Sequence, residues 1–295
     1  MPELPELEVT RERLEAALGG RAVEAAMLHD AFVLRSVEPR FDALPGARIE
    51  RVARRGKHLL LHLDSGVVMA VHLMLGGRLR LRAAGGFRPH RRRTLLSLVF
   101  DDGSLLEMTE AGKKRRASVI LLPGVLPERI DRGAEPLAPE FDAARLGRLL
   151  AAGNHQLKNA LRDPSLISGI GNAYADEILH AARLSPVKLT SRITPGEVER
   201  LHAAIRETLT DWVERIRDAC PQGLPTRQDT WRKHMAVHGR PGEPCPVCGD
   251  PVQRISFAGS ETHYCPTCQN EGRLLADRRL SRFGIRRRER AGDGS

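Results

Sequence analysis

Apolar residues recur at helical intervals at the start of the chain. Leu4, Leu7, Leu14 and Leu18 fall near one face of a helix, and Gly19-Gly20 interrupt the pattern. We therefore predict an amphipathic helix over residues 4–18.

Short apolar runs then alternate with polar turns up to about residue 125. Residues 58–63 and 67–73 are joined by Asp-Ser-Gly, and residues 95–100 and 104–108 by Asp-Asp-Gly. Such pairs are typical of β-hairpins, and several at this spacing favour a β-sandwich or a barrel-like layer.

The apolar period becomes helical again from about residue 142. Helices are expected over residues 143–151, 154–162 and 173–182, and a longer one follows Thr194-Pro-Gly-Glu197, where Thr is the N-cap and Glu completes a capping box. The fold class is therefore α+β, an N-terminal helix and β-sandwich followed by a helical region.

These patterns divide the chain into five parts. Residues 1–125 form an N-terminal domain, 126–141 a linker, 142–243 a helical domain that ends in a basic loop from residue 221, 244–283 a cysteine-bearing segment and 284–295 a disordered basic tail.

Composition indicates the class of partner. The 295 residues carry a formal net charge of +10, which favours a polyanion such as nucleic acid, and only 4% are aromatic, so base stacking is not expected to dominate binding.

No signal peptide or apolar run long enough to span a membrane is seen, so we expect a cytoplasmic, nucleoid-associated protein that has no membrane association and acts as a monomer.

Four of the five cysteines form two closely spaced pairs. Cys245 and Cys248 are followed, after sixteen residues, by Cys265 and Cys268. This spacing is typical of a four-thiolate zinc site, with disulfides or free thiols as the alternative. Because four protein ligands leave no open position, the single zinc ion is expected to be structural.

The first six residues place a proline beside two acids. If the initiator Met is removed, Pro2 has a free secondary amine, which can condense with a sugar C1′ to give a cationic iminium. Glu3 and Glu6 would lie on one face of the helix beside it. The alternative is a charged helix start with no chemistry.

Several basic or glycine-rich segments could contact phosphate, although each has an ordinary structural explanation. They are the Gly169-Ile-Gly-Asn172 turn, residues 54–57, His72, the loop at 87–93 that ends in Arg93, and residues 113–116, which begin with Lys113. Taken singly, the glycine segment fits a common helix turn, His72 fits a hydrogen-bonded buried histidine, and the basic segments fit a solvated surface.

Together these segments resemble the formamidopyrimidine-DNA glycosylase / endonuclease VIII family. The resemblance extends from residue 2 to about 282 and rests on the opening hexapeptide, Arg55-Gly-Lys57, His72-Leu73, residues 166–177 and residues 239–249. It implies a helix–two-turns–helix domain and a zinc hairpin after the β-sandwich, and excision of oxidised bases from duplex DNA followed by strand cleavage.

The resemblance also implies roles for individual residues. Pro2 would attack C1′ of a flipped-out nucleotide, Glu3 would protonate the ring oxygen, Glu6 would assist proton transfer and Lys57 would support chemistry at the sugar. The residues expected to contact DNA are His72, Leu75, Arg93, Lys113, Lys158 and Asn172.

The chain departs from the family pattern at three places, one of which involves two residues. Leu75, next to Met74, stands where a void-filling Met is usual, and either side chain could act as a wedge. Gly112 and Lys114 replace the Arg and Phe that read the opposite base, and Ser260 replaces the hairpin Arg. Lesion preference and δ-elimination therefore stay open.

Three functions fit these observations. The chain is expected to be a bifunctional glycosylase and abasic-site lyase for oxidised bases, cleaving by β-elimination or by β,δ-elimination. The alternatives are a glycosylase/lyase for a bulkier or cross-linked lesion, and a non-catalytic zinc protein that binds damaged DNA.

Overall fold

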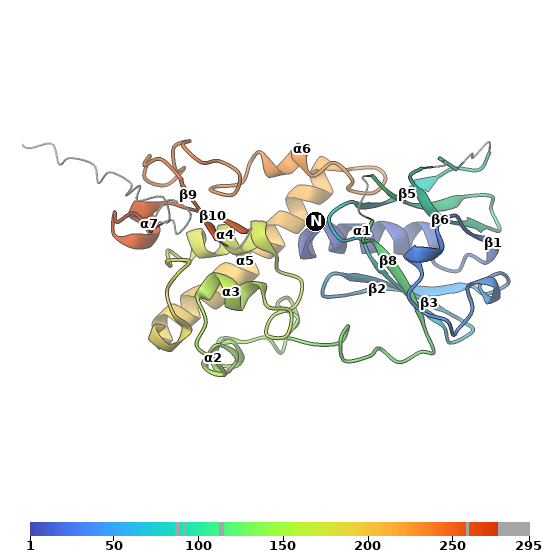
Figure 1. Ribbon diagram of the computed structural model, residues 1–295, viewed down its shortest axis with the longest axis horizontal. Helices are drawn as coiled ribbons and strands as arrows, with labels where there is room; N and C mark the ends of the chain where they lie inside the picture. The colour runs from blue at the N-terminus through green and yellow to red at the C-terminus, as the bar shows by residue number, and fades with distance from the viewer. Residues whose placement is uncertain (86–88, 91, 112–114, 258–259, 277–295) are drawn as a thin grey trace, which may run out of the picture. The chain divides into compact units, whose positions relative to one another are not determined.

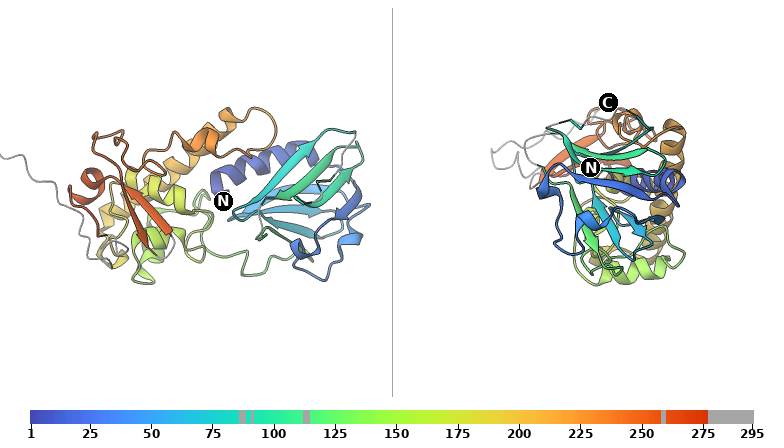
Figure 2. Two further views of the ribbon diagram at one scale, coloured as in Figure 1. Left: turned by 45° about the horizontal axis from the view of Figure 1, so that its top comes forward. Right: turned by 90° about the vertical axis from the view of Figure 1, so that its right-hand side faces the viewer.

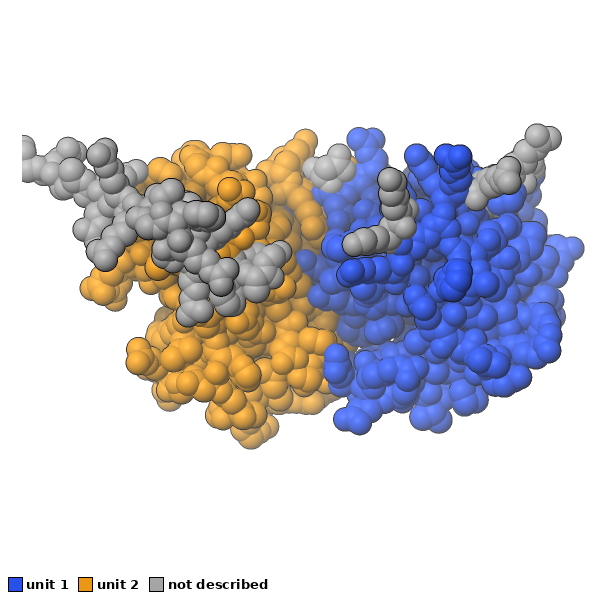
Figure 3. All heavy atoms as spheres, in the orientation of Figure 1, with its two compact units in different colours: residues 1–132, 212–228 blue, residues 133–211, 229–295 orange. Residues whose placement is uncertain are grey.

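A computed structural model describes residues 1–85, 89–90, 92–111, 115–257 and 260–276. The chain divides into two compact units, shown in Figure 3. Unit 1 contains residues 1–132 and 212–228, and unit 2 contains residues 133–211 and 229–295.

Unit 1 begins with helix α1, Leu4–Leu18, as predicted. Glu3 is its N-cap and forms a capping box with Glu6, so orphan N–H groups of the first turn are satisfied. The apolar face of α1 packs into the core of the unit, and the chain leaves the helix at Gly19-Gly20, where Gly20 has a positive φ of 77°.

Two four-stranded antiparallel sheets form the rest of unit 1 (Figures 1 and 2). Both predicted hairpins are confirmed, because β3 pairs with β4 and β6 pairs with β7. One sheet has the order β1-β6-β7-β5, and the other has the order β2-β3-β4-β8. The strands are β1 Val23–Leu28, β2 Ile49–Arg55, β3 His58–Leu63, β4 Val68–His72, β5 Gly77–Arg82, β6 Thr94–Phe100, β7 Leu105–Glu110 and β8 Ser118–Leu122, with short 3₁₀ helices η1 Ala31–Val33 and η2 Phe41–Ala43.

The core of unit 1 draws on both sheets. Leu59 and Leu61 of β3 and Leu96 and Leu98 of β6 belong to one buried cluster with Leu14 of α1. The alternation along these strands places every second side chain in this shared core. The predicted β-sandwich is therefore confirmed.

The described residues of unit 2 form several helices and a two-stranded hairpin. Helix α5 starts at Pro195 behind the predicted cap, where the Glu197 N–H donates to Thr194 Oγ1 at 3.3 Å. Two expectations need correction: the helix predicted from residue 154 starts at Leu157, and the stretch from residue 221 that was expected to be a loop contains the short helix α6. The elements are α2 Ala143–Ala151, α3 Leu157–Arg162, α4 Asn172–Ala181, η3 Thr190–Arg192, α5 Pro195–Ala219, which continues into unit 1, α6 Asp229–Arg232, β9 Gln253–Phe257, β10 Ser260–Tyr264 and α7 Pro266–Asn270.

The predicted α+β class is confirmed. Within the described residues, no helix is both long and apolar enough to cross a membrane.

Candidate functional site

The start of α1 holds two buried carboxyl groups beside Pro2. The Glu3 N–H donates to Glu6 Oε2 at 2.9 Å, while the Glu3 side chain accepts a bond from the backbone N–H of Glu6. Pro2 is buried as well. Because the two bonds are reciprocal, they fix both side chains next to the residue expected to act as the nucleophile.

Lys57 follows a tight turn between β2 and β3, where Gly56 has a positive φ of 55°. The Arg54 guanidinium donates to Gly56 O at 3.0 Å and to Glu8 Oε2 at 2.8 Å. Arg54 therefore connects the turn that carries Lys57 to helix α1, which carries the two carboxyl groups.

This ion pair is mostly shielded from water, since the Arg54 side chain is only 7% exposed. Burial alone would raise the pKa of Glu8, but the charge and hydrogen bond of Arg54, aided by Arg11, lower it below its ordinary value. Glu8 is therefore ionised at neutral pH.

His72 ends β4 and faces His58 across the β3–β4 pair, with ring centroids 4.6 Å apart. Burial, and then the charge of Lys57, lower the pKa of His72 to about 4. The Met74 N–H donates to His72 Nδ1 at 3.2 Å. Because Nδ1 accepts, the neutral ring carries its proton on Nε2, which can donate to an anion.

The turn after His72 presents an apolar side chain to solvent. Leu75 is 67% exposed, whereas the neighbouring Met74 is half-buried and has a positive φ of 50°. A non-glycine residue rarely adopts this conformation, and the bond to His72 helps to hold it. Of the two predicted wedges, Leu75 is the more accessible.

Arg93, a further predicted DNA contact of unit 1, directly precedes strand β6. Arg93 is exposed, and its backbone O accepts a bond from Glu110 N at 2.9 Å, which fixes the base of its loop. Lys113, with Gly112 and Lys114, lies outside the described residues.

Asn172 is the first residue of α4 in unit 2. The turn before it contains Gly169, whose φ is 84°, and Gly171, the N-cap. Gly169 supplies a backbone conformation that other residues avoid, and the turn leads into the N-terminus of α4, which attracts anions.

Lys158 is buried, with only 3% of its surface exposed. Its ammonium lies 2.6 Å from Asp176 Oδ1 and donates to Glu261 O at 2.7 Å and to Thr262 Oγ1 at 2.9 Å. These contacts connect α3 and α4 to strand β10. Lys158 would have to leave them to reach a phosphate.

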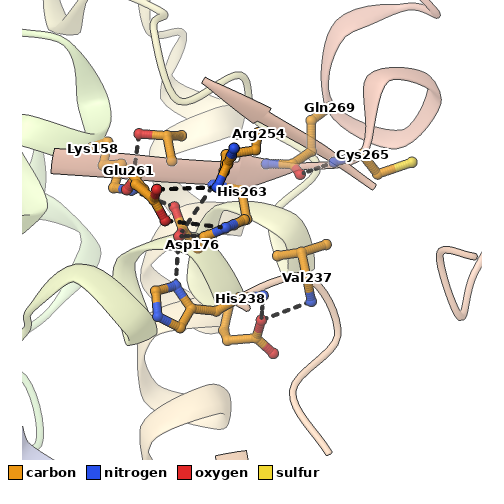
Figure 4. A network of polar contacts seen from close by, with 11 residues as sticks. Lys158, Asp176, Val237, His238, Arg254, Glu261, His263, Cys265 and Gln269 are labelled. Atoms are coloured by element: carbon orange, nitrogen blue, oxygen red, sulfur yellow. Dashed lines mark hydrogen bonds and ion pairs between the residues drawn. The ribbon is translucent and has the colours of Figure 1, made fainter. Parts of the chain in front are cut away.

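Asp176 is the centre of this network. Its Oδ2 lies 2.8 Å from His238 Nδ1 and 3.5 Å from His263 Nδ1 (Figure 4). Burial would raise the pKa of Asp176, but the hydrogen bonds from the two rings and the charge of Lys158 lower it below its usual value. Asp176, His238 and His263 lie close enough to ligate a metal, but the Lys158 ammonium and His238 Nδ1 already contact the two carboxylate oxygens.

The four predicted cysteines come together. The sulfur atoms of Cys245, Cys248, Cys265 and Cys268 all lie within 4.8 Å of one another. A closed set of four thiols suits tetrahedral Zn²⁺ and leaves no position for substrate. The Cys268 N–H lies 3.4 Å from Cys265 Sγ, a backbone donor toward one ligand.

Comparisons with known proteins agree with this arrangement. The profile of the formamidopyrimidine-DNA glycosylase N-terminal domain matches residues 1–116, that of the formamidopyrimidine-DNA glycosylase H2TH domain matches 132–220, and that of the zinc finger found in FPG and IleRS matches 242–270. A formamidopyrimidine-DNA glycosylase of Thermus thermophilus is 37% identical over 291 residues, covering 92% of this chain and 100% of the relative. The chain belongs to the formamidopyrimidine-DNA glycosylase family.

Other members of the formamidopyrimidine-DNA glycosylase family are similarly close. The Symbiobacterium thermophilum protein is 36% identical, covering 95% of this chain and 93% of its own. The MutM (Fpg) structure from T. thermophilus has a TM-score of 0.78 at 34% identity, covering 92% and 100% of the two chains. Lactococcus lactis Fpg, solved with an abasic-site DNA, has a TM-score of 0.80 at 27% identity, covering 91% and 99%.

The family match confirms the predicted resemblance and the zinc prediction. Four cysteines in the matched zinc-finger segment form one structural zinc site. The zinc would be held by these four side chains and would cross-link the segment around the β9–β10 hairpin.

Sequence reasoning missed residues that hold the candidate segments in place within each unit. Glu8, Asp176 and Glu177 are ordinary helix residues by pattern, and Arg54 was interpreted only as a phosphate contact or a solvated edge. Glu8 and Arg54 are 46 residues apart, and no local signal pairs them.

Proposed function

We propose that this chain is a base-excision-repair DNA glycosylase with abasic-site lyase activity on oxidised bases in duplex DNA. The observation that carries the proposal is the buried Glu3–Glu6 capping box directly after Pro2, in a member of the formamidopyrimidine-DNA glycosylase family.

The proposed chemistry begins after the initiator Met is removed. The Pro2 nitrogen uses its lone pair to form a bond to C1′ of the flipped-out nucleotide and then loses its own proton, while the glycosidic bond breaks and the damaged base leaves with the bonding electrons and is protonated. Glu3 donates a proton to the ring oxygen, the C1′–O4′ bond breaks, and a cationic iminium between Pro2 and C1′ results. Glu6, bonded to the Glu3 N–H, assists in these proton transfers.

The iminium then drives strand cleavage. It acidifies the C2′ proton. When a base removes that proton, the electrons form a C2′–C3′ double bond and the 3′ phosphate leaves. Lys57, on the turn held by Arg54, is placed in this scheme next to the sugar phosphate. Whether δ-elimination follows is left open, because Ser260 stands where the family carries an Arg.

Other residues are proposed to bind the DNA. His72 and Asn172 would donate to phosphates, Arg93 and Lys113 would supply charge, and Leu75 would fill the space left by the flipped base. Lys158 would contact phosphate only after leaving Asp176. Such contacts give affinity and register without reading the sequence.

Borohydride trapping tests the proposal. The mature protein is incubated with an abasic-site duplex and with oxidised-base duplexes, and reduction of the iminium leaves a covalent adduct. We expect adducts on both kinds of duplex and much slower adduct formation with Pro2→Gly, whose primary amine is less reactive here but whose DNA binding is retained. Absence of any adduct, with Met1 shown by mass spectrometry to be removed, would refute the enzymatic function and leave a damage-binding zinc protein.

The second candidate is the same chemistry on a bulkier or cross-linked lesion. Ser260, and Gly112 and Lys114 in place of opposite-base readers, favour it. A panel that includes 8-oxoguanine opposite each normal base distinguishes the two. Efficient 8-oxoguanine excision with ordinary opposite-base choice would remove the reason for this candidate.

A further inference from the structure

His180 lies against a zinc ligand. It occupies the last turn of α4, is buried, and places Nε2 3.3 Å from Sγ of Cys245, which is also buried. The two residues are 65 positions apart in the sequence, so tertiary packing brings them together.

The zinc chemistry fixes the direction of this hydrogen bond. A cysteine that binds Zn²⁺ is a thiolate and has no proton to donate, so Nε2 must carry the hydrogen and Sγ must accept it. Four thiolates around one Zn²⁺ leave a net charge of about −2. A buried negative centre is stabilised by donors that point at it, as the Cys268 N–H points at Cys265 Sγ.

Contacts that do not involve His180 also hold helix α4 against residues 236–238 and strand β10. Glu177, one turn earlier, accepts bonds from the backbone N–H groups of Ala236, Val237 and His238 at 2.6–2.9 Å. Asp176 holds strand β10 through the His263 N–H, at 3.3 Å. The ring of His180 is thus presented to Cys245 by a helix that is held both to the chain before Cys245 and to strand β10.

We propose that His180 is an outer-sphere donor of the zinc site, and that its N–H···S bond to Cys245 slows the release of the metal. The bond draws negative charge from one thiolate, which makes that sulfur a poorer target for protons and for competing ligands. Partners of this kind commonly change metal affinity by about 10–100-fold.

The test measures zinc transfer from the full-length, zinc-loaded protein to the chromophoric chelator 4-(2-pyridylazo)resorcinol. We expect His180→Phe, which keeps a flat ring without a donor, to speed release about tenfold. His180→Gln, which retains an N–H donor, should restore part of the difference. The Co²⁺-substituted protein gives a second readout, because loss of the donor should shift its thiolate-to-cobalt charge-transfer band.

His202→Phe is the matched control. His202 lies in the same unit and its Nε2 donates to Phe141 O at 2.7 Å, away from the zinc ligands. Unchanged release and an unshifted band in His180→Phe would overturn the proposal, as would equal acceleration by His202→Phe. If His180→Phe does not fold, the zinc release rate and the cobalt charge-transfer band are measured for His180→Asn, whose side chain is too short to reach the sulfur. The same results would then overturn the proposal.

Discussion

His72 is a hydrogen-bond donor without a charge. Burial and Lys57 keep its ring neutral by lowering its pKa, and the Met74 N–H occupies Nδ1, which leaves Nε2–H for a phosphate. Neutral donors add affinity but release no counterion, whereas each Arg or Lys on a phosphate does.

This difference can be measured with DNA-binding isotherms at several salt concentrations. We expect His72→Ala to weaken binding while leaving the slope of log K against log salt unchanged. Arg93→Ala should reduce the magnitude of that slope by about 0.9, the effect of one lost phosphate contact. A slope reduced equally by His72→Ala would mean that His72 binds DNA as a cation.

Glu3 should matter more for base excision than for strand cleavage. An abasic site already offers an aldehyde to Pro2, so ring opening by a proton donor is less critical there. Glu3→Gln should slow single-turnover excision by about 10²–10⁴-fold and cleavage of a pre-formed abasic site much less. Equal losses in the two assays would argue against the ring-protonating role.

At the scale of elements, the Glu8–Arg54 pair joins helix α1 to the β2–β3 turn. Glu8→Gln leaves the Arg54 charge buried without its partner, which should cost about 2–4 kcal/mol of unfolding free energy. Because Arg54 also holds Gly56 O, the misplaced Lys57 should slow single-turnover cleavage by about tenfold or more.

Glu12→Gln is the control for this prediction. Glu12 lies on the same helix and pairs with Arg217 at 2.9 Å, but both side chains are well exposed. Its loss should cost less than about 1 kcal/mol and leave the rate unchanged. If urea unfolding and single-turnover rates cannot separate the two variants, the positioning role of Arg54 is wrong.

At the scale of the whole molecule, the two facing histidines of unit 1 should make stability fall in acid. Burial lowers the pKa of both His58 and His72 from 6.5 to about 4. Between these values the unfolded chain binds protons that the folded chain does not, so stability is complete above about pH 6.5 and declines as the pH falls toward 4.

Each ring can contribute up to about 3 kcal/mol to this decline. Urea unfolding between pH 4 and pH 7 measures this decline. His58→Asn should reduce the slope of the unfolding free energy against pH, in this acid range, by the equivalent of about one bound proton. If the unfolding free energy falls equally steeply in acid for the variant and for the unmodified protein, His58 and His72 are not a pair of neutral rings in the folded state.

Zinc removal should act on unit 2 as a whole. The four thiolates cross-link residues 245–268, so chelation should expose the backbone amides of this segment to hydrogen exchange and weaken DNA binding. Added zinc should restore both. Cys220→Ser, which alters a cysteine outside the site, should change neither, and unchanged exchange after verified metal loss would refute the coupling.

The sequence by itself determined the features that depend on neighbouring residues. The helix of residues 4–18 follows from its apolar spacing and its Gly19-Gly20 stop, the two hairpins follow from alternating runs around polar turns, and the zinc site follows from the spacing of two cysteine pairs. The capping box at Thr194 was predicted for the same reason, since its partners are three residues apart.

Only the tertiary structure decided the contacts between distant residues. Arg54 meets Glu8 across 46 positions, His180 meets Cys245 across 65, and Lys158 meets Glu261 across 103. Burial and charge at these points depend on how sheets and helices pack, which no local pattern encodes. The family resemblance implied Lys158 as a phosphate contact, and only the structure places its ammonium against Asp176 and strand β10.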